Sequence, residues 1–275
     1  MHKPAKDLRN FPGALGYNPV TANLRTPMAT CIAIALFLFA TAAIGQQAPA
    51  TVSPPASDTE APGPSLEETM AAALDGDAEA QSMIGSMYEE RDSHEDAVRW
   101  YRKAAAQDQP DAQFKLGFYH AIGGGGLAKD LATAVKWFQK AAKASQVAAQ
   151  YNLAVCYEKG LGVSKDDAAA LTWYRRAAAQ GETYAQKAVG VFYEQGRGAK
   201  PDRVEACAWY KLASARSNPD ATRLLKKLSS KLNAKELKLA NKRGSELSVQ
   251  IYKNPLGAST QTAIKKKIPT KDFLE

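Results

Sequence analysis

All four tryptophans of the chain recur at a nearly constant spacing, and each is followed by a second aromatic residue. Trp100, Trp137, Trp173 and Trp209 are 37, 36 and 36 residues apart. An Ala-Gln dipeptide recurs in step with them. A period of this length indicates one supersecondary unit that occurs four times and stacks into an array, without a single central core. Such an array is typical of a binding surface and not of a catalytic pocket.

The third copy, residues 148–181, shows how one unit is built. Its first half places small and apolar residues on one helix face, and Gly160 and Gly162 then allow the positive φ of a helix end. Asp166 follows as the predicted N-cap of a second helix, which carries Trp173. We therefore predict two helices in each unit. We predict that the repeated aromatic side chains form the core and bind no cofactor: Trp100, Trp137, Trp173, Trp209, Tyr157 and Tyr193.

The complete pattern resembles the Sel-one-like repeat, a branch of the tetratricopeptide group. Residues 149–178 and 185–214 match it best; residues 112–142 carry His120 in the tyrosine slot and an enlarged turn, and residues 80–106 have a shortened turn. The resemblance implies an all-α, tetratricopeptide-like α-solenoid of antiparallel helix pairs in a right-handed superhelix. It also implies an adaptor role, often in bacterial envelopes and host contact, and no enzymatic activity.

Composition divides the chain into four parts. We expect a leader over residues 1–44, a disordered Pro- and Ala-rich linker over 45–65, a helical array over 66–250, and a basic disordered tail over 251–275. Within the array we place the four repeats and a closing pair of capping helices at about 77–110, 111–146, 147–181, 182–216 and 217–250.

The leader has the parts of a secretory signal. Ten consecutive apolar residues, Cys31–Ala40, follow a basic flank and precede the small-residue sequence Ala40-Thr41-Ala42. The run is short for a membrane span, which needs about 20 apolar residues. We predict export to the periplasm, the cell envelope or the medium; a retained single anchor, a cytoplasmic protein and a translation start at Met28 stay open as alternatives.

Charge is concentrated at the ends of the chain. The net charge is +8, with +3 in residues 1–44, +8 in residues 217–275 and −3 in the remainder. The high pI therefore does not predict a specific nucleic-acid interface, because that needs a basic patch on a folded face. The C-terminal lysines indicate either a solvated capping face or a contact with an anionic membrane or another polyanion.

The sequence carries no recognisable catalytic or metal-binding pattern. The histidines are few and dispersed, and there is no Gly-x-Ser-x-Gly, Ser-x-x-Lys or Lys-Thr-Gly. We expect no cofactor, no metal and no small-molecule substrate. Association with the family leaves one alternative, a cell-wall or β-lactam-related hydrolase or its accessory subunit. Cys156 and Cys207 are interpreted as two small buried thiols, with a single bridge between them as the alternative.

The partner-binding surface can be assigned only by analogy with tetratricopeptide stacks, whose first helices line the concave face. This predicts two rows of side chains that face a protein or peptide partner. The first row is Phe114, Tyr151 and Lys187, and the second is Glu89, Glu158 and Glu194. The first row differs between units, which fits both a specific groove and unselected surface drift. The leading hypothesis is a non-enzymatic scaffold that binds a protein on this face.

Overall fold

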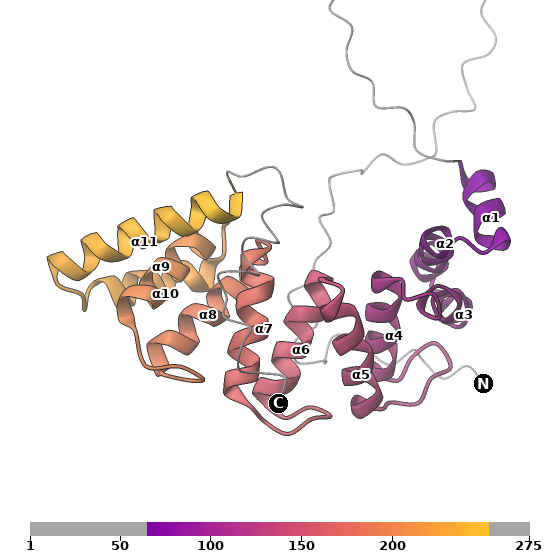
Figure 1. The fold of residues 1–275 in the computed structure, drawn as a ribbon, viewed down its shortest axis with the longest axis horizontal. Coiled ribbons are helices and arrows are strands. Elements are labelled where there is room, and N and C mark those ends of the chain that lie inside the picture. The colour runs from indigo at the N-terminus through magenta and orange to yellow at the C-terminus, as the bar shows by residue number, and fades with distance from the viewer. Residues whose placement is uncertain (1–64, 253–275) are drawn as a thin grey trace, which may run out of the picture. The chain divides into compact units, whose positions relative to one another are not determined.

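The structure is a computed structural model that describes residues 65–252, and these residues form eleven α-helices and no strand (Figure 1). The all-α prediction is confirmed. The helices are α1 (Leu66–Asp75), α2 (Ala78–Glu90), α3 (His94–Ala105), α4 (Pro110–Ile122), α5 (Leu131–Lys143), α6 (Val147–Lys159), α7 (Asp167–Ala179), α8 (Thr183–Gln195), α9 (Arg203–Ser214), α10 (Pro219–Ser229) and α11 (Ala234–Tyr252). The predicted leader, its cleavage site or anchor, nearly all of the linker and the tail lie outside the described residues.

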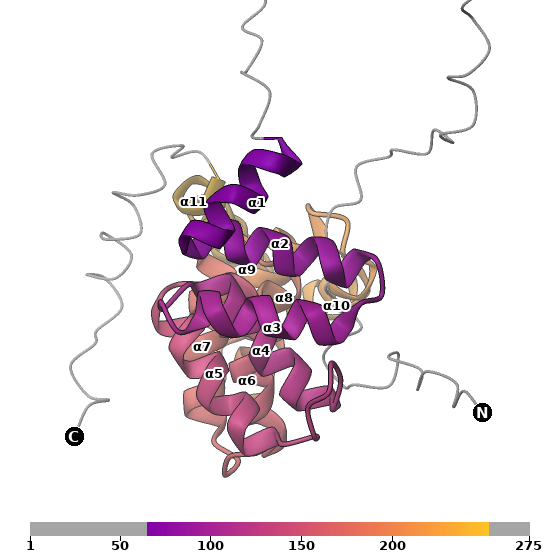
Figure 2. The same ribbon diagram turned by 90° about the vertical axis from the view of Figure 1, so that its right-hand side faces the viewer.

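The helices pack in chain order as four hairpins (Figures 1 and 2). Unit 1 is α2–α3, unit 2 is α4–α5, unit 3 is α6–α7 and unit 4 is α8–α9; the second helix of each unit also packs on the first helix of the next. Helix α1 packs on α2 in the place of a preceding second helix. Each unit therefore buries one face within itself and another on its neighbour, which is the construction of a solenoid.

Side-chain caps fix where the helices start. The Asp166 carboxylate accepts from the backbone N–H groups of Ala168 and Ala169, so the predicted cap is confirmed. Asp130 and Asp202 cap the equivalent helices of units 2 and 4, whereas Ser93 makes no side-chain cap in unit 1. The first helices of the four units, and α10 after them, have caps that the sequence analysis did not assign: Asp77, Gln109, Gln146, Glu182 and Asn218.

The turn between the two helices of a unit also joins it to the preceding unit. Gly160 ends α6 with φ 67°, as expected for a left-handed cap. Gly162 has φ 71°, and a Cβ there would clash with the backbone of Leu131 at the start of α5. Glycine is therefore required at position 162 both for the backbone angle and for the close approach of unit 3 to unit 2.

The most buried aromatic residue in each second helix is the one after the tryptophan. The residues in this position are 0–2% exposed: Tyr101, Phe138, Tyr174 and Tyr210. Trp209 is 5% exposed, whereas the other three indoles are only partly buried and pack on the edge of the core. The sequence analysis assigned the tryptophans to the core without ranking them against the residue that follows; the second aromatic is the more deeply buried of each pair, because one residue further along a helix points about 100° away.

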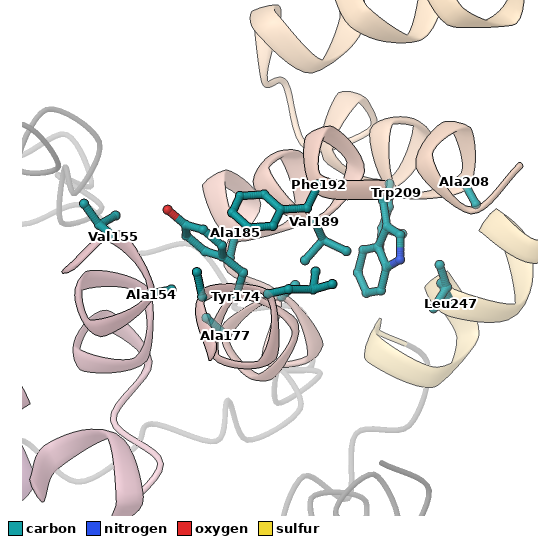
Figure 3. Packing of buried hydrophobic residues seen from close by; sticks show 14 residues of the cluster. Ala154, Val155, Tyr174, Ala177, Ala185, Val189, Phe192, Ala208, Trp209 and Leu247 are labelled. Atoms are coloured by element: carbon teal, nitrogen blue, oxygen red, sulfur yellow. The ribbon is translucent and has the colours of Figure 1, made fainter. Parts of the chain in front are cut away.

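The indoles of units 1 to 3 each lie beneath a cation one turn further along the same helix. Lys103 Nζ is 4.1 Å from the ring centroid of Trp100, and the equivalent distances at Trp137 and Trp173 are 4.8 Å to Lys140 and 4.4 Å to Arg176. In unit 4 this position is Leu212, which belongs to the same buried cluster as Trp209 and Leu247 of α11 (Figure 3). Helix α11 therefore covers the indole that has no cation above it.

The last two helices do not form the expected closing pair. Both α10 and α11 pack chiefly on α9, and the C-terminal end of α11 reaches α8. At its end, the Gln186 side-chain amide of α8 donates to the Tyr252 hydroxyl at 2.6 Å. The Arg216 guanidinium lies 4.2 Å from the centroid of the Tyr252 ring. The far end of α11 is thus anchored on unit 4, which closes the array on one side.

Candidate partner-binding surface

The first predicted row changes from core to surface along the array. Phe114 of α4 is 7% exposed, and its ring centroid is 5.9 Å from that of Phe138, so it belongs to the core and is not available to a partner. Tyr151 of α6 is partly buried beside Tyr174. The Lys187 side chain of α8 is 26% exposed. The prediction for Phe114 was wrong because the unit has a phenylalanine opposite, which attracts a second aromatic side chain.

The three glutamates of the second predicted row lie at the edge of the core and form hydrogen bonds with it. The carboxylates of Glu89, Glu158 and Glu194 accept hydrogen bonds from the buried tyrosine hydroxyls of Tyr101, Tyr174 and Tyr210 at 2.7, 2.7 and 2.8 Å. Burial and the nearby carboxylate both raise the pKa of each of these tyrosines. Each glutamate therefore satisfies a polar atom that would otherwise be buried without a partner.

Unit 2 lacks both members of this bridge. Ala121 replaces the glutamate and Phe138 replaces the tyrosine, and both are completely buried. A lone glutamate here would have no hydroxyl donor, and a lone tyrosine would have no carboxylate acceptor. The acid and the hydroxyl are thus present together in units 1, 3 and 4 and absent together in unit 2.

Ion pairs link the same glutamates to the next unit. Lys115 Nζ lies 2.6 Å from the Glu89 carboxylate, and Arg197 lies 3.0 Å from Glu158 and 2.6 Å from Asp167. Burial alone would raise the pKa of Glu158, but hydrogen bonds from Tyr174 and Arg197 and the neighbouring positive charges lower it. Two of the predicted partner-binding glutamates therefore hold successive units together.

The accessible part of the predicted surface lies on α6 and α8. We define the α6–α8 face as Tyr151, Tyr184 and Lys187. Tyr184 is 37% exposed, and Lys187 Nζ lies 5.8 Å from its ring centroid and 3.3 Å from the Asp220 carboxylate. Burial, followed by the charge of Glu182, raises the pKa of Tyr151. The sequence analysis missed Tyr184, although it lies three residues before Lys187 and therefore on the same helix face.

The thiols and the potential metal ligands show no cluster of reactive groups in residues 65–252. Cys156 and Cys207 are free and buried in separate clusters, so the alternative of a bridge between them is wrong. Burial raises the pKa of Cys156 to about 12 and also raises that of Cys207. No group of three His, Cys, Asp or Glu side chains in this part of the chain could hold a metal ion.

Paired helices, glycine turns and unit-to-unit packing define a helical repeat protein of the solenoid class. The Sel1 repeat model matches residues 78–109, 110–145, 147–182 and 183–218. The chain therefore belongs to the Sel1 repeat family, as the sequence pattern indicated. No curated protein sequence matches the chain.

Two solved structures are similar to the chain. A Sel1 repeat protein from Oxalobacter formigenes is 32% identical, with a TM-score of 0.56, over 59% of this chain and 48% of that one. The protective antigen c5321 of uropathogenic Escherichia coli, described as displaying an SLR fold, is 28% identical, with a TM-score of 0.48, over 73% of this chain and 50% of that one. The match thus spans about half the length of each of these two structures.

Proposed function

We propose that the chain is a non-enzymatic scaffold that binds a protein or peptide through the α6–α8 face. The observation that carries the proposal is the exposed ring of Tyr184 beside the Lys187 ammonium, with Tyr151 at its edge. Tyrosine and cationic side chains on a rigid support supply most of the binding energy in many protein interfaces. Sel1 repeats generally mediate protein–protein interaction, which agrees with this assignment.

The rigidity of the face supports the proposal further. Tyr151 packs on Tyr174, whose hydroxyl is held by Glu158, and Lys187 is held towards α10 by Asp220. Side chains that are already ordered lose less conformational entropy when a partner binds. Units 3 and 4 have the same Glu–Tyr bridge in their cores, but Tyr151 of unit 3 and Lys187 of unit 4 differ at equivalent surface positions. The face can therefore be specific to this chain.

Site-specific crosslinking in the native cells tests the proposal. A photoreactive amino acid at position 184 is expected to give a discrete adduct with one partner, and Tyr151→Ala/Lys187→Glu is expected to reduce its yield at least fivefold. The matched control is the same amino acid at Lys136, an exposed residue of α5 on a second helix. Equal adducts at positions 184 and 136, or a yield that the double substitution leaves unchanged, would remove the α6–α8 face from consideration.

We further propose that this scaffold acts outside the cytoplasm. The support is the apolar run Cys31–Ala40 with its basic flank and small-residue exit, which lies outside the described residues. In residues 65–252, no helix is long and apolar enough to cross a membrane. Fractionation of cells that carry a C-terminally tagged chain, together with mass spectrometry of its N-terminus, is expected to find an exported form shortened near Ala42. Full-length protein in the cytoplasmic fraction would contradict export.

A further inference from the structure

The two ends of the repeat array carry opposite charge. Residues 65–96, which include α1 and α2, contain ten carboxylates and one arginine, a net charge of −9. Residues 219–252, which include α10 and α11, contain eight lysines and arginines and three carboxylates, a net charge of +5. Because the helices pack in chain order from α1 to α9, with α10 and α11 on α9, these regions lie at opposite ends of the array (Figure 1).

The acidic end contains an open apolar groove. Leu66, Met70 and Leu74 of α1 and Met87 and Tyr88 of α2 line a groove of about 460 Å³. Leu66 and Leu74 are 51% and 69% exposed. In units 1 to 4 the second helix packs on the first helix of its own unit. Helix α1 occupies the position of a second helix, but in residues 65–252 no helix packs on it in the position of that first helix. Glu67 and Arg91 both lie in the groove wall, and the exposed Asp75 follows Leu74 directly.

The basic end presents the opposite pattern on a single helix face. Leu239 of α11 is 53% exposed, and Lys235, Lys238 and Lys242 lie within one helical turn of it. These three lysines are exposed and form no ion pair with other described residues. The other face of α11, which includes Leu247, packs on α9. The end of the array therefore offers a leucine surrounded by cations on a rigid helix.

We infer that the outer face of α11 in one copy docks into the groove between α1 and α2 of a second copy. Leu239 would lie against Leu74 and Met70, and the lysines around it would face the carboxylates of the acidic end. A groove between two helices accepts a third helix in the way that successive units accept each other within the chain. The contact joins two different surfaces, so it is heterologous and repeats into open chains or closed rings.

An anionic membrane is the other surface that exposed lysines could contact. The second copy is favoured because one contact covers both the groove at the acidic end and Leu239 at the basic end. A bilayer would engage only the basic end and would leave Leu66 and Leu74 uncovered, with repulsion between anionic lipids and the acidic end. This inference goes beyond the proposed function and does not depend on the α6–α8 face.

Complementary variants of the full chain test this contact by sedimentation velocity. Leu74→Glu damages only the groove, and Leu239→Glu damages only the outer face of α11; both positions are exposed, so the fold should tolerate the change. Val249→Glu is the matched control, because Val249 is 49% exposed on α11 but lies ten residues, or about 15 Å, further along the helix than Leu239. Circular dichroism and thermal melting verify that all variants fold.

The single variants and their mixture are expected to distinguish a head-to-tail contact from self-association through one and the same surface. The wild type and Val249→Glu should show an average mass that rises with concentration and is lower in about 0.5 M salt, because salt screens the attraction between the charges that surround the apolar contact. Leu74→Glu and Leu239→Glu should each stay monomeric, whereas their equimolar mixture should form a dimer through the one intact pair of surfaces.

Three outcomes would overturn the inference. The wild type could stay monomeric at all concentrations, both single variants could associate as the wild type does, or the mixture could stay monomeric. A parallel flotation assay uses vesicles that contain phosphatidylserine. A monomeric wild type that floats with these vesicles, and loses at least tenfold binding in Leu239→Glu, would assign the basic face to a membrane and overturn the second copy as its partner.

Discussion

Unit 2 and the other three units make the same helix pair with different core chemistry. In units 1, 3 and 4 a buried tyrosine donates its hydroxyl to a glutamate at the core edge, while unit 2 has Phe138 and Ala121 at those positions. The helix pairs remain equivalent, so the backbone does not require the polar bridge. What the fold requires is that the hydroxyl and its acceptor occur together, because either one alone is an unsatisfied polar group.

The first prediction tests whether the second aromatic of each pair is the centre of the core. Phe138→Ala should destabilise the chain by about 3–5 kcal/mol, because it leaves a cavity at a completely buried site. Trp137→Ala is the matched comparison, and it should cost about half as much, since the indole is only partly buried and its other face lies beneath Lys140. Urea denaturation measures both. An equal or larger loss for Trp137→Ala would return the tryptophan to the centre of the core.

The second prediction introduces a hydroxyl where unit 2 has no acceptor. Phe138→Tyr should destabilise the chain by about 1–3 kcal/mol, because the new group is buried opposite Ala121. Adding Ala121→Glu should recover part of this loss by rebuilding the bridge that the other units contain. Thermal melting of the two variants gives the comparison. A stability gain for Phe138→Tyr alone would show that the hydroxyl needs no carboxylate.

The third prediction concerns the cations that link the bridges to the next unit. Arg197→Ala should cost about 1–2 kcal/mol, because it removes hydrogen bonds to two carboxylates from a partly buried site. Lys115→Ala should cost less than about 1 kcal/mol, since the pair with Glu89 is partly exposed and screened by salt. Denaturation at low and high salt should separate the two, and the reverse order would contradict the assigned geometry.

The fourth prediction uses pH to remove the glutamate charge in unit 3. The pKa of Glu158 is lower in the folded chain than in the unfolded chain, where the ordinary value is about 4.3. Its contribution is therefore complete above the unfolded value and is lost as pH falls through the folded one. Glu158→Gln has no charge to lose, so its stability should decline less steeply than that of the wild type below about pH 5. Parallel stability curves would show that Glu158 contributes nothing to the acid sensitivity.

Local features of the fold were predictable from the sequence because they depend on neighbouring residues. The period of the tryptophans gave four helix pairs, and Asp166 and Gly160 marked a helix start and a helix end. These features rest on spacing and on backbone angles that few residue types accept. The same reasoning gave the helical repeat class before any contact was known.

Features that depend on distant contacts were not predictable in this way. The bridge between Glu158 and Tyr174 joins two helices through positions 16 residues apart, and the contact between Gln186 and Tyr252 joins positions 66 residues apart. Phe114 was misplaced on the binding surface because the opposite side chain, Phe138, determines that it turns inwards. On the α6–α8 face, Tyr184 could have been found from its helical spacing to Lys187, which the sequence analysis did not apply.

A double-mutant cycle in unit 4 tests most directly whether the acid and the hydroxyl are one structural element. Glu194→Ala, Tyr210→Phe and the double variant, which gives unit 4 the core chemistry of unit 2, are compared by urea denaturation with the wild type. The loss in the double variant should be smaller than the sum of the two single losses by about 1–2 kcal/mol. Losses that simply add would contradict the account, because Glu194 and Tyr210 would then stabilise the unit independently.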